Sequence, residues 1–184
     1  ICSKIILVEP QPECIKILRK KFSNIPKVLI LPYGLSSKKE NLQLKINSSN
    51  PLISTFSSHW NKGRFSNSKW DQVINVNTTT LDQLISDYGH PKFIKIDVEG
   101  FELEVLKGLS QKTGIISFEF TSEFIEDATK CLVYLNKLGY KKFNYSEGES
   151  RKFSFEWVSM DKILIEIKNK IKIDSYLWGD IYAK

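Results

Sequence analysis

Two acidic residues, Asp97 and Glu99, stand where an apolar segment gives way to a helical pattern. Residues 93–98 are mostly apolar, which is typical of a buried strand in a parallel sheet. Gly100 permits a tight turn, and residues 103–109 carry apolar side chains at helical spacing. Because open α/β sheets bind their ligands at the carboxyl ends of strands, we expect both acids at the mouth of a crevice.

A third acid, Glu119, lies between two phenylalanines near the end of another apolar segment, residues 115–120. If the two segments are neighbouring strands, Asp97 and Glu119 meet at one edge of the sheet. A buried carboxyl group is costly without a task, and burial or a neighbouring carboxylate raises its pKa toward the range of a general base. We therefore predict that Asp97, Glu99 and Glu119 are catalytic, and that Glu102 and Glu104 cap the following helix.

A divalent metal ion shared by Asp97 and Glu119 is an alternative, because it would activate a bound hydroxyl group in the same way. His59 and His90 lie far apart in sequence and form no metal-binding pair. Oxygen ligands from so few groups are unspecific. We therefore expect metal-free catalysis and assign no metal ligand.

Glu9 follows an apolar segment near the start of the chain, residues 5–8. An acid at this place in such a sheet accepts hydrogen bonds from the ribose hydroxyls of an adenosine cofactor, and it would serve NAD equally well. A role in capping the Gln11-Pro12 turn is the alternative. Tyr33 and Gly34 follow the next strand, so the topology predicts that they pack near the adenine.

The elements that must position these residues alternate between strand and helix, as in a doubly wound α/β fold. Residues 42–46 alternate apolar with polar side chains and predict a half-exposed antiparallel strand. Residues 47–71 are rich in aromatic residues but have no period, so we expect either a substrate wall or a surface loop. The expected strands are residues 5–8, 28–31, 42–46, 93–98, 115–120, 142–145 and 163–167, and the expected helices are residues 13–22, 80–88, 102–108 and 124–138.

The chain resembles the FkbM family of S-adenosylmethionine-dependent methyltransferases. The resemblance rests on Lys-Ile-Asp-Val-Glu-Gly at residues 95–100 and the helix after it, and it extends to residues 8–10, 80–84, 117–120 and 178–180. It implies a mostly parallel, Rossmann-like methyltransferase sheet with an antiparallel C-terminal hairpin. It also implies S-adenosylmethionine as the cofactor, for which we assign Glu9, Tyr33, Gly34 and Asp97, and O-methylation of a sugar or other small-molecule hydroxyl.

Residues 1–184 are expected to form a single domain of this family. The first strand and the glycine-rich loop of the family have no counterpart in the sequence. The chain starts at Ile1 and has a single methionine, Met160, so we expect it to be part of a longer product. A sheet lacking its first strand has an open edge, and we expect poor stability and weak cofactor binding for this chain alone.

The net charge of +6 invites a nucleic-acid interpretation, but of 27 basic residues only Arg19, Arg64 and Arg151 are arginines. Dispersed lysines are more typical of solvated surfaces than of phosphate recognition, so a nucleic-acid partner is not expected. The sequence has no apolar segment long enough to span a bilayer. Its odd number of cysteines, three, favours reduced thiols and therefore a cytoplasmic location.

Two other functions stay open. The chain is an NAD-dependent oxidoreductase if a Gly-x-Gly-x-x-Gly loop precedes it, because the sheet and Glu9 suit either cofactor. Alternatively, it is a non-catalytic binding module that keeps the fold without the cofactor.

Overall fold

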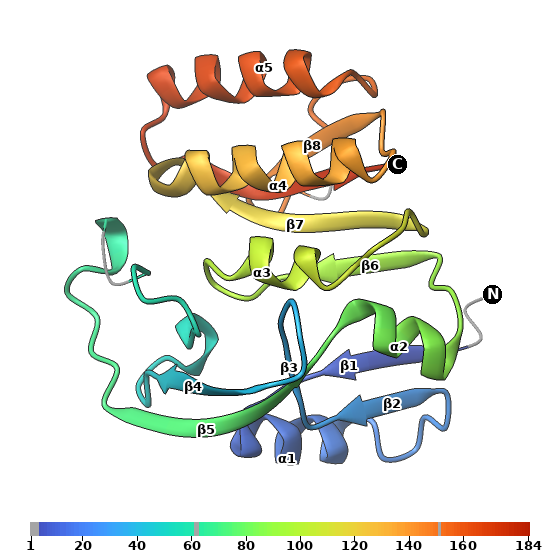
Figure 1. The fold of residues 1–184 in the computed structure, drawn as a ribbon. Helices are drawn as coiled ribbons and strands as arrows, with labels where there is room; N and C mark the ends of the chain where they lie inside the picture. The colour runs from blue at the N-terminus through green and yellow to red at the C-terminus, as the bar shows by residue number, and fades with distance from the viewer. Residues whose placement is uncertain (1–3, 61–62, 151) are drawn as a thin grey trace.

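The computed structural model describes residues 4–60, 63–150 and 152–184 (Figure 1). Strands and helices alternate along the chain, so the predicted mixed α/β class is confirmed. The strands are β1 (Ile5–Val8), β2 (Val28–Leu31), β3 (Gly34–Leu35), β4 (Asn41–Ile46), β5 (Gln72–Thr79), β6 (Phe93–Ile96), β7 (Ile115–Thr121), β8 (Phe143–Glu147) and β9 (Trp178–Ala183). The α-helices are α1 (Pro12–Lys21), α2 (Leu81–Tyr88), α3 (Glu102–Lys107), α4 (Ile125–Lys137) and α5 (Met160–Ile173), and the short 3₁₀ turns are η1 (Pro51–Ile53), η2 (Gly63–Phe65) and η3 (Ser122–Phe124).

The described strands form three sheets rather than one continuous sheet. β1 and β2 pair in parallel, β5 lies between β3 and β4, and a four-stranded sheet has the order β6-β7-β9-β8. Within these sheets, β1 pairs only with β2 and β6 only with β7, so each of the two strands has an open edge. Figure 1 shows the two-stranded and four-stranded sheets as separate groups. A continuous doubly wound sheet stays a prediction.

The four-stranded sheet carries the main core on one of its faces. Alternate residues of β6 and β7, among them Ile96, Ile116 and Phe118, are almost fully buried and pack with apolar residues of α3, α4 and α5. The residues between them, such as Lys95 and Glu119, belong to the opposite face because strand side chains alternate. The two strands therefore separate a dry apolar face from a face that carries charge.

The C-terminal part of the sheet corrects one sequence prediction. Residues 163–167 are part of helix α5 and not a strand. Ile163 and Ile167 are fully buried and share a helical face with Ile171, a four-residue spacing that outweighs the local alternation of isoleucine with lysine. The antiparallel partner of β8 is instead β9, which inserts between β7 and β8.

The antiparallel strand predicted at residues 42–46 is confirmed. β4 is antiparallel to β5, although β5 itself was not expected from the sequence. Thr80 caps helix α2 by accepting a hydrogen bond from the backbone N–H of Gln83 at 3.0 Å. Among the described helices, none is long and apolar enough to cross a membrane.

Two residues of the segment 47–71, Thr55 and Trp60, contact the turn that follows β6. Trp60 is only 3% exposed and stacks between Phe65 and Phe124, with ring centroids 5.1 and 4.8 Å away. The Trp60 ring also lies against Gly100, where an added Cβ atom would come within 2.4 Å of it. Trp60 is therefore packed onto the strand end, while other residues of the segment, such as Leu52 at 81% exposure, lie at the surface.

Gly100 has a positive φ of 85° and no room for a side chain, whereas Gly89 has a φ of 90° with nothing within 4 Å of an added Cβ. We expect Gly89→Ala to cost about 1–3 kcal/mol of unfolding free energy through backbone strain alone. Gly100→Ala should cost at least about 1 kcal/mol more, because Trp60 must also move. Urea unfolding of both variants measures the difference. Equal losses would show that Trp60 does not hold this turn.

Candidate active site

The turn after β6 has an unusual backbone. Glu99 has a φ of 55° and Gly100 follows at 85°, so two consecutive residues adopt left-handed conformations. The Oε1 atom of Glu102 accepts hydrogen bonds from the N–H groups of Val98 at 3.3 Å and Gly100 at 3.1 Å. The Thr55 hydroxyl donates to the carbonyl of Glu99 at 2.6 Å. The turn is thus held from within and from the segment that covers it.

Glu102 corrects another prediction. Glu102 is only 8% exposed, and its carboxylate accepts hydrogen bonds from the preceding turn. The N-cap residue of α3 is Phe101, whose side chain makes no capping hydrogen bond. Glu104, by contrast, pairs with Lys107 near the surface at 2.6 Å. Sequence reasoning missed the role of Glu102 because a left-handed turn cannot be recognised from residue spacing alone.

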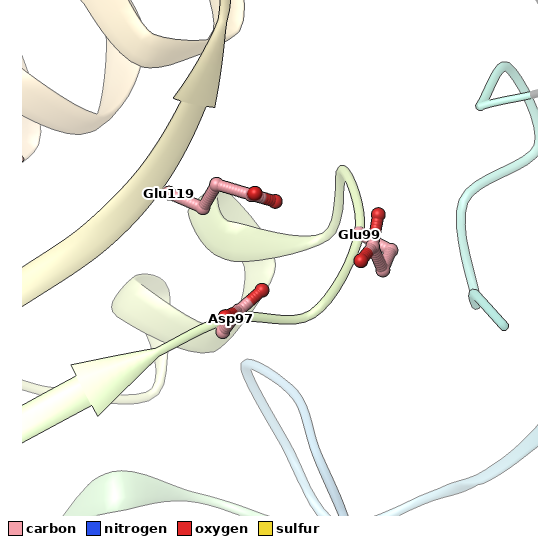
Figure 2. A group of neighbouring side chains, drawn as sticks. All are labelled: Asp97, Glu99 and Glu119. Carbon is pink, nitrogen blue, oxygen red and sulfur yellow. The ribbon is translucent and has the colours of Figure 1, made fainter. Parts of the chain in front are cut away.

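The three acids predicted to be catalytic meet at one place. One carboxylate oxygen of each of Asp97, Glu99 and Glu119 lies within 4.8 Å of the others (Figure 2). Asp97 and Glu99 come from the turn after β6, and Glu119 comes from the neighbouring parallel strand β7. The expected convergence is therefore found, while the catalytic roles stay predictions.

Burial dominates the electrostatics of this acidic cluster of Asp97, Glu99, Glu102 and Glu119. Burial, followed by the charges of Asp97, Glu99 and Glu102, raises the pKa of Glu119 to about 9. Burial and then the charges of Asp97 and Glu102 raise the pKa of Glu99 to about 8. Burial also raises the pKa of Glu102, to about 7. Near neutral pH, Glu99 and Glu119 are mostly protonated and act as hydrogen-bond donors as well as acceptors.

Lys95 provides a positive charge beside the cluster. Its Nζ lies 2.7 Å from Oδ1 of Asp180 and 3.3 Å from Oδ2 of Asp97. Burial alone would lower the pKa of Lys95, but the hydrogen bond to Asp180 and the charge of Asp97 raise it above its ordinary value. Neither Lys95 nor Asp180 was predicted as a site residue; the only signal was a lysine inside the otherwise apolar strand Phe93–Ile96.

A small cavity of about 20 Å³ lies beside Glu119, which is space for about one water molecule. Its walls include Trp60, Gly100, Glu102 and Thr121. Trp60 of the segment 47–71 thus lines a cavity next to the acids, while a substrate wall stays a prediction.

Of the predicted cofactor residues, only Asp97 belongs to this cluster, and Glu9, Tyr33 and Gly34 lie on other elements. Glu9 follows β1, and its Oε1 accepts a hydrogen bond from the N–H of Gln11 at 2.8 Å, which matches the turn-capping alternative. Burial raises its pKa, although Gln11 lowers it in part. Tyr33 is 41% exposed. Gly34 faces the Phe56 ring, 2.8 Å from the position of an added Cβ, so packing within the protein already requires a glycine there.

The raised pKa values make stability depend on pH. Unfolded glutamates titrate near 4.5, so between about pH 5 and 9 the unfolded chain binds fewer protons than the folded chain does at Glu99 and Glu119. The unfolding free energy must therefore fall as pH rises through this window. Glu119→Gln, which mimics the protonated form, should flatten the fall by a few kcal/mol over the whole window.

Urea unfolding at intervals from pH 5 to 9 tests this expectation. Glu13→Gln is the matched control, because the Glu13 side chain is 79% exposed and its replacement should leave the slope unchanged. If the unfolding free energy falls with pH equally in the native chain and in Glu119→Gln, the raised pKa of Glu119 is contradicted.

Comparison with known proteins confirms the resemblance seen in the sequence. A solved structure, methyltransferase FkbM from Methylobacillus flagellatus KT, matches 99% of the chain with a TM-score of 0.55 at 13% identity, and the match covers 36% of that longer protein. At this identity the likeness shows the fold alone. A comparison with curated protein sequences gives no significant match. The family profile for the methyltransferase FkbM domain matches residues 2–142, and the chain therefore belongs to the FkbM methyltransferase family.

Proposed function

We propose that the chain is an S-adenosylmethionine-dependent methyltransferase that methylates a hydroxyl oxygen of a sugar or another small molecule. The observation that carries this proposal is the meeting of Asp97, Glu99 and Glu119 at adjacent strand ends in a chain of this family. In this proposal the two-stranded and four-stranded sheets are two parts of one Rossmann-like methyltransferase sheet. The open edges of β1 and β6 would then face each other where the two parts are separated.

The chemistry of these residues suits the cofactor. S-adenosylmethionine supplies an electrophilic methyl group on a positively charged sulfur. A cluster of buried acids with raised pKa values favours a cationic ligand, because a nearby positive charge stabilises their ionised forms. Glu9 would bind the ribose hydroxyls through its carboxylate, Tyr33 and Gly34 would lie near the adenine, and Asp97 would face the charged part.

The acids would also prepare the acceptor. A sugar hydroxyl is a weak nucleophile at neutral pH, so a general base within hydrogen-bond reach helps it to react. In this assignment Asp97 and Glu99 orient the hydroxyl, and Glu119 in its ionised form takes the proton. Positioning of the acceptor oxygen supplies much of the remaining rate enhancement.

The setting of the reaction follows from other features. Cys14 and Cys131 are free thiols, which suits a cytoplasmic protein; Cys2 lies outside the described residues. The acceptor is a small molecule in this proposal, and a nucleic-acid substrate is not expected because the lysines are dispersed along the chain.

Calorimetric titration of S-adenosylmethionine, S-adenosylhomocysteine and NAD into the chain tests the proposal. We expect both sulfur compounds to bind and NAD not to bind. Glu9→Gln should weaken their binding roughly tenfold through a lost charge-assisted hydrogen bond, while the nearby exposed variant Glu13→Gln should bind normally. With a hydroxyl acceptor in hand, Asp97→Asn should lose turnover and should also weaken cofactor binding, because Asp97 would face the charged part of the cofactor.

The two alternatives give different results. Binding of NAD alone would favour the oxidoreductase. Binding of none of the three compounds, to this chain or to one extended at its N-terminus, would favour the non-catalytic module. Unchanged turnover in Asp97→Asn would remove Asp97 from the mechanism.

A further inference from the structure

Lys95 joins carboxylates from two strands that do not pair with each other. Asp97 follows β6 and Asp180 lies in β9, while β7 runs between these strands. The lysine side chain reaches across β7 to bind Asp180 at 2.7 Å and also lies 3.3 Å from Asp97. The Asp180 side chain is only 18% exposed, so this contact is shielded more than most surface ion pairs.

Glu119 occupies the position between these two carboxylates. It is the β7 residue directly opposite Asp180, and its carboxylate approaches Asp97 on the other side. Both neighbours are paired with Lys95, whereas the Glu119 carboxyl group forms no hydrogen bond or ion pair with any described residue. The lysine thus neutralises the groups beside Glu119 rather than Glu119 itself.

In the part of the chain that the structure describes, the other cations near Glu119 are bound to different acids. Arg64 forms two 2.7 Å hydrogen bonds with Glu123, and Asp127, which lines the same cavity as Glu119, pairs with Lys130 at 2.6 Å and with His59 at 3.2 Å. Among the described residues, the charged or titratable groups around Glu119 are Asp97, Glu99, Glu102, Lys95, Asp180, Arg64, Asp127, Cys131 and, through its pair with Asp127, His59.

We propose that Lys95 and Asp180 are positioning residues, which hold the Asp97 side chain through ion pairing beside Glu119 and leave Glu119 as the group that exchanges a proton during methyl transfer. The reaction step rests on the proposed function. Glu119 releases its proton to solvent when a cationic ligand binds, and the resulting carboxylate takes the proton of the acceptor hydroxyl. At the same time the new oxygen–carbon bond forms and the sulfur–carbon bond breaks, so charge and atoms balance.

The charge arrangement can be tested without any ligand by following the side-chain carboxyl ¹³C signal of Glu119 against pH in the 184-residue chain. Glu119→Gln assigns the signal. In Lys95→Met we expect the Glu119 titration midpoint to rise by about half a pH unit, because a nearby positive charge is lost. In Asp180→Asn it should fall, because a negative neighbour is lost and Lys95 is less neutralised.

Two further variants serve as controls. Lys95→Arg should restore the original midpoint, since it keeps the charge. Lys168→Met makes the same change in net charge at a distant, half-exposed pair with Glu126 and should have no effect. A loosened site that admits water would lower the midpoint in Lys95→Met and Asp180→Asn alike, so opposite shifts separate the proposed role from structural damage. An unchanged or lower midpoint in Lys95→Met overturns the proposal.

The pH dependence of S-adenosylmethionine affinity provides the second readout. We expect affinity to increase as Glu119 ionises, with a pH midpoint that moves in each variant as the carboxyl signal does. If the Glu119 midpoint shifts in opposite directions in Lys95→Met and Asp180→Asn but S-adenosylmethionine binds at no pH, the proposed function and the proton transfer to Glu119 are refuted. The charge arrangement around Glu119 would still stand. If S-adenosylmethionine binds but the Glu119 midpoint does not shift in the variants, the positioning role of Lys95 and Asp180 is refuted and the methyltransferase proposal stands.

Discussion

The site depends on one buried carboxylate, that of Glu102. Its Oε1 satisfies the N–H groups of Val98 and Gly100, and these bonds hold the two left-handed residues that carry the Glu99 side chain toward Glu119. Buried N–H groups without an acceptor cost about 1–3 kcal/mol each, so the turn would not keep this shape with an apolar residue at position 102. Glu102 is therefore an acid whose first task is structural, although its charge also acts on its neighbours.

The division of the sheet into an apolar and a charged face explains why the acids gather there. In β6 and β7, every second side chain enters the core under α3 and α4, and the intervening positions carry Lys95, Asp97 and Glu119 on the other face. The insertion of β9 beside β7 adds Asp180 to this face, opposite Glu119. Trp60, itself almost fully buried, then lies against Gly100 in the same turn.

The sequence predicted those parts of the site that depend on neighbouring parallel strands. Asp97 and Glu119 each follow an apolar run, and the carboxyl ends of paired parallel strands necessarily meet. The roles of Asp180 and Trp60 could not be predicted in this way, because both reach the site through contacts between distant parts of the chain. The strand expected at residues 163–167 was wrong because an Ile-rich segment with interspersed lysines fits two periods, and only packing against α4 and β8 selects the helix.

The balance of charge in the site has a consequence for the ligand. Among the described residues, five carboxyl groups, those of Asp97, Glu99, Glu102, Glu119 and Asp180, share the site with one lysine. Burial keeps Glu99 and Glu119 largely neutral near pH 7 until a positive charge arrives. A cationic ligand must therefore release protons as it binds, and its affinity must increase with pH. In the methyltransferase assignment, transfer of the methyl group removes the positive charge from sulfur. The product then no longer stabilises the ionised acids, and the same cluster that favours the cofactor favours release of the spent form.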